Sequence, residues 1–260
     1  MLLRASCRLT YEVTSPAAMI LMLRPRSGAG QWVVRESYAI TPQVPVYEYT
    51  DGYGNLCQRL VAPEGRFVVQ TAAEVETAPE VDVAPGAPFT LVDQLPDGVV
   101  PFLLPSRYCE SDRLLELAQE VAGDATPGYD QAAAICTWIH QHITYRYGTS
   151  DASTSARDTA EGRVGVCRDF AHLGIAVCRS LSIPARMVVG YLHRLDPMDM
   201  HAWFEAFVGE RWYTFDATQD APRGGRIVVA YGRDAADVAV ATVFGGAQLG
   251  ELSVQVEELG

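Results

Sequence analysis

The sequence contains no lysine, so all 20 of its basic residues are arginine. Aspartate and glutamate together number 32, which leaves a formal net charge of −12. A protein that binds nucleic acid or an anionic membrane presents a basic surface to the phosphates, and no basic stripe occurs in this sequence. We therefore expect neither nucleic acid nor a membrane among its partners.

Long apolar runs are missing as well. The longest run near the start covers residues 18–23, far short of the roughly 20 residues that a membrane-spanning helix needs. Arg4 and Arg8 interrupt the beginning of the chain, so a secretory signal is not expected. The six cysteines form no Cys-x-x-Cys pair, which argues against a zinc site or a redox motif. We expect a cytoplasmic protein with free thiols and no metal or cofactor.

Residues 1–105 have the pattern of a β-rich domain with a linker. Runs rich in β-branched and aromatic residues alternate with clusters of glycine, proline, aspartate and asparagine. These runs cover residues 8–13, 18–23, 31–40, 44–50, 56–61 and 67–75. Such regular spacing is typical of an antiparallel sandwich. Prolines cluster in residues 79–105, which indicates an extended connection.

The pattern changes to a helical period after this connection. Helices are expected at residues 111–121, 130–143 and 167–182, and a loop at residues 144–163. Strands are expected at residues 185–192, 202–208, 211–218, 227–231 and 252–256. We predict an α+β fold in which residues 106–222 pack a helix on an antiparallel sheet. Residues 223–260 are expected to be a C-terminal β segment that completes a sheet.

One cysteine lies where a helix is predicted to begin. After Cys167, apolar side chains recur at spacings of three and four, at Phe170, Leu173, Val177 and Leu181. Cys167 therefore falls in the first turn, where unpaired N–H groups and the positive end of the helix dipole favour an anion. We expect its thiol to ionise more readily than that of a free cysteine. A thiolate needs only a base and an orienting group to become a catalyst.

A histidine and an aspartate flank a predicted hairpin between two aromatic-rich runs. Gly209-Glu210 is a pair suited to a two-residue turn. With that turn, His201 and Asp216 lie on the same face as diagonal neighbours, about 7 to 8 Å apart between backbones. A turn of odd length would place them on opposite faces. The spacing favours a contact between the imidazole and the carboxylate.

The two faces of this hairpin differ in character. One face is apolar and is expected to join the core: Ala202, Phe204, Ala206, Val208, Tyr213, Phe215 and Ala217. The other is polar and is expected to be free to line a site: His201, Glu205, Thr214, Asp216 and Thr218. Trp203 shares the polar face, so we expect it to line the cleft.

Other reactive residues fit structural roles better than catalytic ones. Cys178 lies three turns along the apolar stripe and is expected to be buried and inert. His172 faces another side of the same helix, which favours packing or hydrogen bonding. Asp169 is expected to complement the helix N-terminus. His140 and His142 point about 200° apart on a helix and make a poor metal pair.

Four motifs in this order closely resemble the transglutaminase-like superfamily, and more narrowly its bacterial branch of cysteine peptidases. The motifs are Gly-Val-Cys-Arg-Asp-Phe-Ala-His (165–172), Ser-Ile-Pro-Ala-Arg-Met-Val-Val-Gly-Tyr-Leu (182–192), Met-His-Ala-Trp-Phe-Glu (200–205) and Trp-Tyr-Thr-Phe-Asp-Ala-Thr (212–218). The resemblance reaches residues 106–109 and 232–234, so it covers nearly the whole chain. Ala235 departs from it, because relatives often have an aromatic residue there.

The resemblance implies a papain-like, transglutaminase-like catalytic domain with a complete triad. Cys167 matches the nucleophile, His201 the general acid and base, and Asp216 the carboxylate that orients the imidazole. The implied chemistry is acyl transfer from a peptide or side-chain amide through a thioester. The oxyanion would lie near the Cys167 N–H and one further donor, which the sequence does not identify.

Three outcomes remain open for this chemistry. Hydrolysis is favoured, because small bacterial relatives are usually assigned as peptidases. The alternatives are amide formation with an amine acceptor and a catalytically silent binding or scaffold protein. The absence of lysine removes every side-chain amine of the chain itself as an accidental acceptor. The acyl donor and the oligomeric state are not indicated by the sequence.

Overall fold

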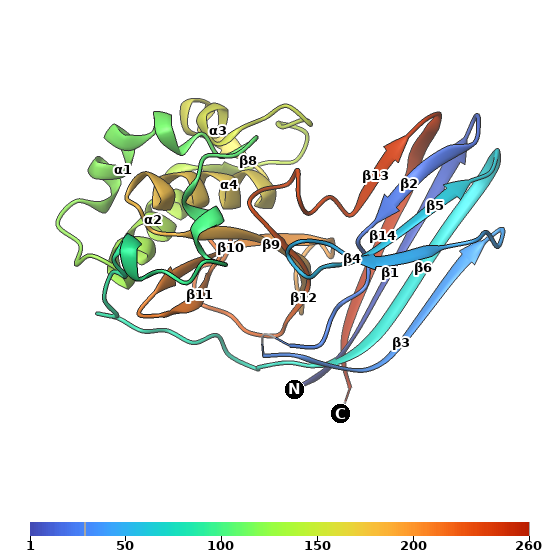
Figure 1. Ribbon diagram of the computed structural model, residues 1–260, viewed down its shortest axis with the longest axis horizontal. Helices are drawn as coiled ribbons and strands as arrows, with labels where there is room; N and C mark the ends of the chain where they lie inside the picture. The colour runs from blue at the N-terminus through green and yellow to red at the C-terminus, as the bar shows by residue number, and fades with distance from the viewer. Residues whose placement is uncertain (29, 260) are drawn as a thin grey trace.

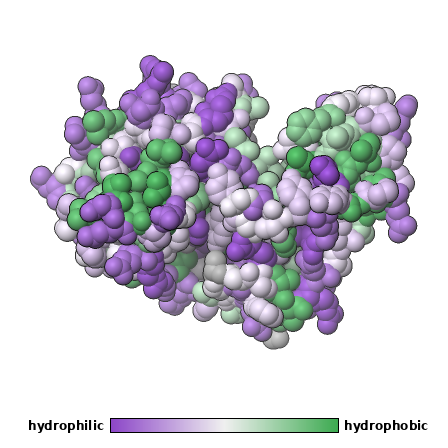
Figure 2. Space-filling model, viewed as in Figure 1, coloured by the Kyte–Doolittle hydropathy of each residue, from purple (hydrophilic) through white to green (hydrophobic). Residues whose placement is uncertain are grey.

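The computed structural model describes residues 1–28 and 30–259 as a mixed α+β protein (Figure 1). Two four-stranded antiparallel sheets form a sandwich at one end, and a third four-stranded sheet carries helices at the other. The predicted fold class is confirmed. Hydrophilic and hydrophobic residues alternate over the face shown in Figure 2, where a hollow separates the helical part from the outer end of the sandwich.

The sandwich is built from strands with alternating burial. One sheet has the order β14 (Ala247–Leu259), β1 (Leu2–Val13), β6 (Gly65–Glu76) and β3 (Trp32–Thr41). The other has the order β13 (Ala241–Phe244), β2 (Ala17–Leu21), β5 (Leu56–Ala62) and β4 (Tyr47–Thr50). In β1 the side chains of Leu3, Ala5, Cys7 and Leu9 are buried, as the period of two predicts. They share one hydrophobic core with Met19 from the opposite sheet.

The proline-rich connection crosses from the sandwich to the helical part along one side of the third sheet (Figure 1). It contains two short 3₁₀ helices, η1 (Val92–Gln94) and η2 (Val100–Leu103). Backbone hydrogen bonds hold it in place. Tyr129 donates to the carbonyl of Ala87 at 3.0 Å, and Gly209 donates to the carbonyl of Pro88 at 2.8 Å.

The third sheet carries helices on one face. Its order is β11 (Arg211–Phe215), β10 (His201–Val208), β9 (Ala185–Leu192) and β12 (Arg226–Gly232). The helical segments are η3 (Ser111–Arg113), α1 (Leu115–Ala122), α2 (Tyr129–His142), α3 (Ala156–Gly162) and α4 (Cys167–Ser180). Helix α4 packs directly on β9 and β10, and α2 packs on α4 and on β10 and β11 (Figure 1). Within the described residues, no helix is long and apolar enough to span a membrane.

The local predictions were wrong in three places. The helix expected from residue 111 begins as η3, and the α-helix proper starts at Leu115. The expected loop at residues 144–163 contains β7 (Thr144–Tyr145) and α3 and leads into β8 (Val164–Gly165). Helix α3 was missed because its seven residues carry little apolar periodicity; the Ser155 side chain caps it by accepting from the Asp158 N–H. Strand β13 was not predicted.

The C-terminal segment contributes to all three sheets. Strand β12 joins the helix-bearing sheet, whereas β13 and β14 return to the two sheets of the sandwich. The chain thus leaves the sandwich, forms the helical part and comes back. The division into domains at residues 105 and 222 stays a prediction. Residues 223–260 add strands to three sheets and do not complete a single one.

Two side-chain amides from the sandwich part close the outer edge of β12. Gln31 accepts from the Val228 N–H at 2.7 Å and donates to the Val228 carbonyl at 2.8 Å. Asn55 does the same with Tyr231, at 2.8 and 2.7 Å. Both amides are buried, so they satisfy backbone groups that an edge strand otherwise leaves unpaired. Through β12 the sandwich helps to position the site described next.

Candidate active site

Helix α4 begins at Cys167, as predicted from the apolar spacing. The Val166 N–H donates to the Asp169 carboxylate at 2.9 Å, while the Val166 carbonyl accepts from the N–H groups of Asp169 and Phe170. The predicted role of Asp169 at the helix N-terminus is therefore confirmed. Gly165 allows this approach, because a Cβ there would come within 2.7 Å of the Asp169 Cβ. Cys167 itself is half-buried.

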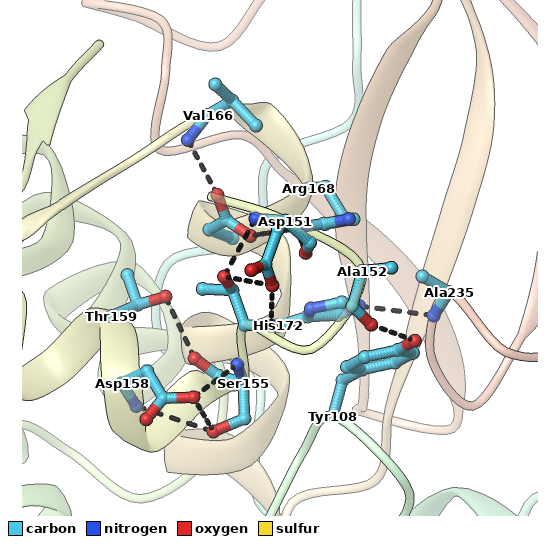
Figure 3. Close-up of polar contacts among 12 residues, drawn as sticks. Tyr108, Asp151, Ala152, Ser155, Asp158, Thr159, Val166, Arg168, His172 and Ala235 are labelled. Carbon is cyan, nitrogen blue, oxygen red and sulfur yellow. Dashed lines mark hydrogen bonds and ion pairs between the residues drawn. The ribbon is translucent and has the colours of Figure 1, made fainter. Parts of the chain in front are cut away.

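A polar network behind the thiol fixes the first turns of α4 (Figure 3). The Arg168 guanidinium donates to Asp169 at 3.0 Å and to the Asp151 carbonyl at 2.7 Å. His172 accepts from the Ala235 N–H at 3.1 Å and stacks on Tyr108, with ring centres 5.1 Å apart. The nucleophile helix is thereby tied to two distant loops.

The contacts of His172 agree with its predicted role in packing and hydrogen bonding. Burial, with a smaller contribution from Arg168, lowers the pKa of His172 to about 3. The imidazole is therefore neutral at physiological pH and available as an acceptor for Ala235. Ala235, the position that departs from the family pattern, contributes its backbone here.

The hairpin has the predicted register. Val208 pairs with Arg211, and the ladder continues to Phe204 opposite Phe215. Gly209 and Glu210 have φ values of 54° and 67°, which is the left-handed pair that a type I′ turn requires. The ladder ends at Phe215, and Asp216 follows directly.

This register brings His201 and Asp216 together. His201 Nε2 lies 2.7 Å from Asp216 Oδ2. Their side chains are only 2% and 4% exposed, so solvent screens the contact little. Asp216 Oδ1 accepts from the N–H and the hydroxyl of Thr218, at 3.1 and 2.7 Å. The carboxylate is therefore held by groups on both oxygens.

A buried arginine completes this cluster. The Arg226 guanidinium lies 2.8 Å from Asp216 Oδ2, the oxygen that also contacts His201. Burial raises the pKa of Asp216, but Arg226 and then His201 outweigh it, so the pKa lies well below its usual range. Asp216 is therefore a carboxylate over the whole physiological range.

The third member of the cluster is the thiol. Burial lowers the pKa of His201, but Asp216 and the neighbouring Cys167 more than compensate and raise this pKa to about 9. The imidazole is therefore protonated at neutral pH. Because Nε2 contacts Asp216, Nδ1 is the nitrogen left to face Cys167. The structure thus brings together all three site residues singled out from the sequence.

The sequence interpretation missed Arg226. The one available signal was a lone charge directly before the apolar run at residues 227–230, which begins a buried strand. Its partner could not be read from the sequence, because Arg226 reaches Asp216 from a strand that lies on the other side of β9 and β10.

The polar face of the hairpin lines cavities as expected, through Glu205, Thr214 and Asp216, although it is largely enclosed. Both faces of β10 are buried. Glu205 is largely buried and paired with Arg186 at 2.6 Å. Trp203 is fully buried under the Arg226 guanidinium, which lies 4.8 Å from the ring centre.

Two cavities are lined by Arg226. One, of about 370 Å³, is lined by Trp203, Glu205 and Arg226 among others. The second, of about 260 Å³, touches Asp216 and Arg226 and is bordered by Cys136 and His140. Trp203 thus lines a cavity, as predicted, although this cavity touches Arg226 rather than Cys167.

The other polar residues are dispersed. In the described ranges, no group of three or more histidine, cysteine, aspartate or glutamate side chains has the arrangement of a metal site. His140 Nδ1 lies 3.0 Å from the Ala217 carbonyl, whereas His142 Nδ1 lies 2.8 Å from that of Trp138. The two rings therefore have separate structural partners.

Comparisons with known proteins agree with the geometry. A model of the transglutaminase-like superfamily matches residues 115–217, and a model of the bacterial transglutaminase-like N-terminal region matches residues 8–76. An uncharacterised protein of Mycobacterium leprae is 30% identical over 265 residues, which cover 95% of this chain and 94% of that protein. A protein of Mycobacterium tuberculosis is 36% identical over 115 residues, which cover 38% of this chain and 37% of that protein.

A solved structure has the same fold over the entire chain. It is a crystal structure of a candidate cysteine protease from Cytophaga hutchinsonii, with 40% sequence identity and a TM-score of 0.94. The match covers 100% of this chain and 91% of that one. From its motifs, its matched family models and this likeness, the chain belongs to the transglutaminase-like superfamily.

Proposed function

We propose that this chain is a thiol-dependent amide hydrolase, a cysteine peptidase or amidase that works through a thioester at Cys167. The observation that carries the proposal is the buried contact of 2.7 Å between His201 and Asp216, with the Cys167 thiol as the other neighbour of the imidazole. A nucleophile, a base and an orienting group in one chain of contacts are what nucleophilic acyl transfer requires. The substrate is a peptide or protein amide.

The reaction follows from the charges of these groups. The Cys167 thiolate attacks the amide carbon, so a C–S bond forms and the carbonyl oxygen becomes an oxyanion. As the C–N bond breaks, the His201 imidazolium gives its proton to the departing amine. The neutral imidazole then takes a proton from the water that attacks the thioester, which releases a carboxylic acid and free Cys167. Asp216 remains ionised and keeps the ring oriented throughout.

Hydrolysis is favoured over transfer by the competition for the thioester. Water is the solvent and competes with any amine for attack on the thioester. An amine at millimolar concentration therefore reacts faster than water only if a site on the protein orients it, with an effective molarity of about 10⁵ M or more. The acidic protein attracts cationic amines, but long-range attraction alone does not supply that factor. The chain has no lysine to act as its own acceptor. Amide formation with a primary amine is the alternative.

A product analysis tests the proposal. The protein is incubated with a panel of peptide and glutaminyl amides, with and without added primary amines, and the products are identified by mass spectrometry. We expect carboxylic acid products that disappear in Cys167→Ala. Predominant amide product at millimolar amine would establish the transferase instead. A folded protein that forms no acyl-enzyme at Cys167 with any donor would favour the silent scaffold.

We also propose a cytoplasmic location. All six cysteines are free thiols in the described chain, and free thiols persist in reducing compartments. Fractionation of cells that express the full-length protein tests this, and recovery in a secreted or membrane fraction would contradict it.

A further inference from the structure

The Arg226 side chain has room to move away from the carboxylate that it contacts. Its guanidinium lies 2.8 Å from Asp216 and borders both cavities, of about 370 and 260 Å³. Among the described residues, its Nη1 has no hydrogen-bond partner. Packing alone therefore does not hold the guanidinium on Asp216, so its position depends on where the backbone of Arg226 lies.

The backbone at Arg226 is tied to the residues that directly follow β6 of the sandwich. The Thr77 hydroxyl donates to the Arg226 carbonyl at 2.7 Å. Beside it, the Gly225 N–H donates to the Ala78 carbonyl at 3.0 Å. Since β12 is the outer strand of its sheet, these bonds give partners to backbone groups that no further strand of that sheet pairs.

Two glycines let the two segments lie this close. Gly225 has a φ of 67°, in the left-handed region that favours glycine. A Cβ on Gly224 would come within 2.3 Å of the Pro79 carbonyl. The start of the proline-rich connection therefore determines where β12 begins.

Thr77 is itself held by the sandwich. The preceding residue, Glu76, pairs with strands on both sides, β1 and β3. Gln31, beside β3, binds both backbone groups of Val228, two residues after Arg226. Of these two ties from the sandwich to β12, the Thr77 hydroxyl is the one made to Arg226 itself.

We propose that Thr77 is a positioning residue of the catalytic site, a role that rests on the proposed function. Its hydroxyl holds the Arg226 carbonyl so that the guanidinium stays on the Asp216 oxygen that contacts His201. Thr77 acts through Arg226 and not on the thiol or the imidazole directly. A residue of the sandwich end thereby helps to orient the catalytic imidazole.

Matched substitutions separate this role from a loss of stability. Thr77→Val removes the hydroxyl and keeps the branched shape of the side chain, whereas Thr77→Ser keeps the hydroxyl. Thr14→Val is the control, because the Thr14 hydroxyl also donates to a distant carbonyl, that of Gly246 at 3.0 Å in the sandwich. Hydrolysis of p-nitrophenyl acetate gives kcat and KM for each variant, with Cys167→Ala as the background. Thr77→Val is measured in the wild type and in Arg226→Gln.

We expect Thr77→Val to lower kcat about 10-fold with little change in KM, because the displaced guanidinium no longer holds Asp216 in place. In Arg226→Gln the same substitution should have no further effect on kcat, since the residue through which Thr77 acts is already gone. Thr77→Ser and Thr14→Val should stay near the wild type.

A wild-type kcat in Thr77→Val, or an equal loss in the two backgrounds, would overturn the inference alone. A wild type no faster than Cys167→Ala would overturn the proposed function. Crystal structures of the wild type and Thr77→Val then decide the inference independently of turnover. We expect the contact between Arg226 and Asp216 to lengthen in Thr77→Val, and an unchanged contact would overturn the inference.

Discussion

The Arg226 guanidinium lies 2.8 Å from the Asp216 carboxylate, on the same oxygen that contacts His201. Asp216 is therefore shared between two cations in a site that solvent hardly reaches. Two buried charges of opposite sign offset the loss of hydration only if every partner is in place. The arginine thus holds the carboxylate ionised, and the carboxylate in turn holds the imidazole protonated.

Replacing this arginine should affect both stability and the response to acid. We expect Arg226→Gln to lower the free energy of unfolding by about 3 kcal/mol, because the buried Asp216 carboxylate then loses a cation that offsets its lost hydration. The pKa of Asp216 should rise, so activity and stability should be lost at a higher pH on the acid side than in the wild type. Urea unfolding and pH–rate profiles measure both effects.

Arg211→Gln is the matched control, since Arg211 forms an exposed pair with Asp82. Exposed pairs contribute less than about 1 kcal/mol, so this variant should stay near the wild type in both measurements. Similar losses in the two variants would contradict a special role for Arg226.

The acid–base pair can be tested by removing each partner. His201→Ala should abolish nearly all turnover, and Asp216→Asn should lower it by a factor on the order of 10² to 10⁴, because the ring loses the group that fixes its orientation and charge. Steady-state rates with an identified substrate measure this, and circular dichroism checks that both variants fold. Normal turnover in His201→Ala would disprove the triad assignment.

The raised pKa of His201 predicts the direction in which both turnover and stability change with pH. Turnover should fall as the pH rises through about 9, because the leaving amine then lacks its proton donor. The folded state binds this proton more tightly than the unfolded chain, whose ordinary pKa is about 6.5. The stabilisation from His201 is therefore complete below about pH 6.5 and is lost as the pH rises to about 9.

The difference in unfolding free energy between the wild type and His201→Ala isolates this contribution, because the other titrating groups largely cancel. The difference should shrink between pH 6.5 and 9. A difference that grows with pH over this range would show that His201 is neutral in the folded protein.

The two cysteines of α4 should react very differently. Cys167 is half-buried at the helix start, whereas Cys178 is fully buried and burial raises the pKa of its thiol. A short pulse of iodoacetamide below pH 8 should label Cys167 and leave Cys178 unmodified until the protein is unfolded. Peptide mapping quantifies both sites, and equal labelling in the folded protein would refute the activated nucleophile.

The features that the sequence predicted correctly are local ones. Runs rich in β-branched and aromatic residues between turn clusters predicted most strands of the sandwich, and one two-residue turn predicted that His201 and Asp216 share a face. The apolar stripe placed Cys167 at the start of a helix. Each inference needed only residues close to one another in sequence, where periodicity and turn chemistry operate.

The features that were missed depend on contacts between distant segments. Arg226 meets Asp216 only because β12 begins at the end of the sheet where β11 stops, and no spacing encodes that arrangement. Strand β7 pairs with β8 over only two residues, too few to leave a periodic signal. Glu205 was expected to line a site from its alternation, but its pairing with Arg186 from the neighbouring strand was not foreseen.

The pairing of β1 with β14 has a consequence for how the protein is made. Leu2 lies opposite Leu259, and β13 adds to β2 in the other sheet. A chain emerging from the ribosome completes β1 and β2 first, yet their partners β14 and β13 follow the entire helical part. Both strands therefore wait with an unpaired edge until the helical part has been translated, a state prone to pairing with other chains. Early binding by a chaperone would protect this protein more than one whose sheets form from consecutive strands.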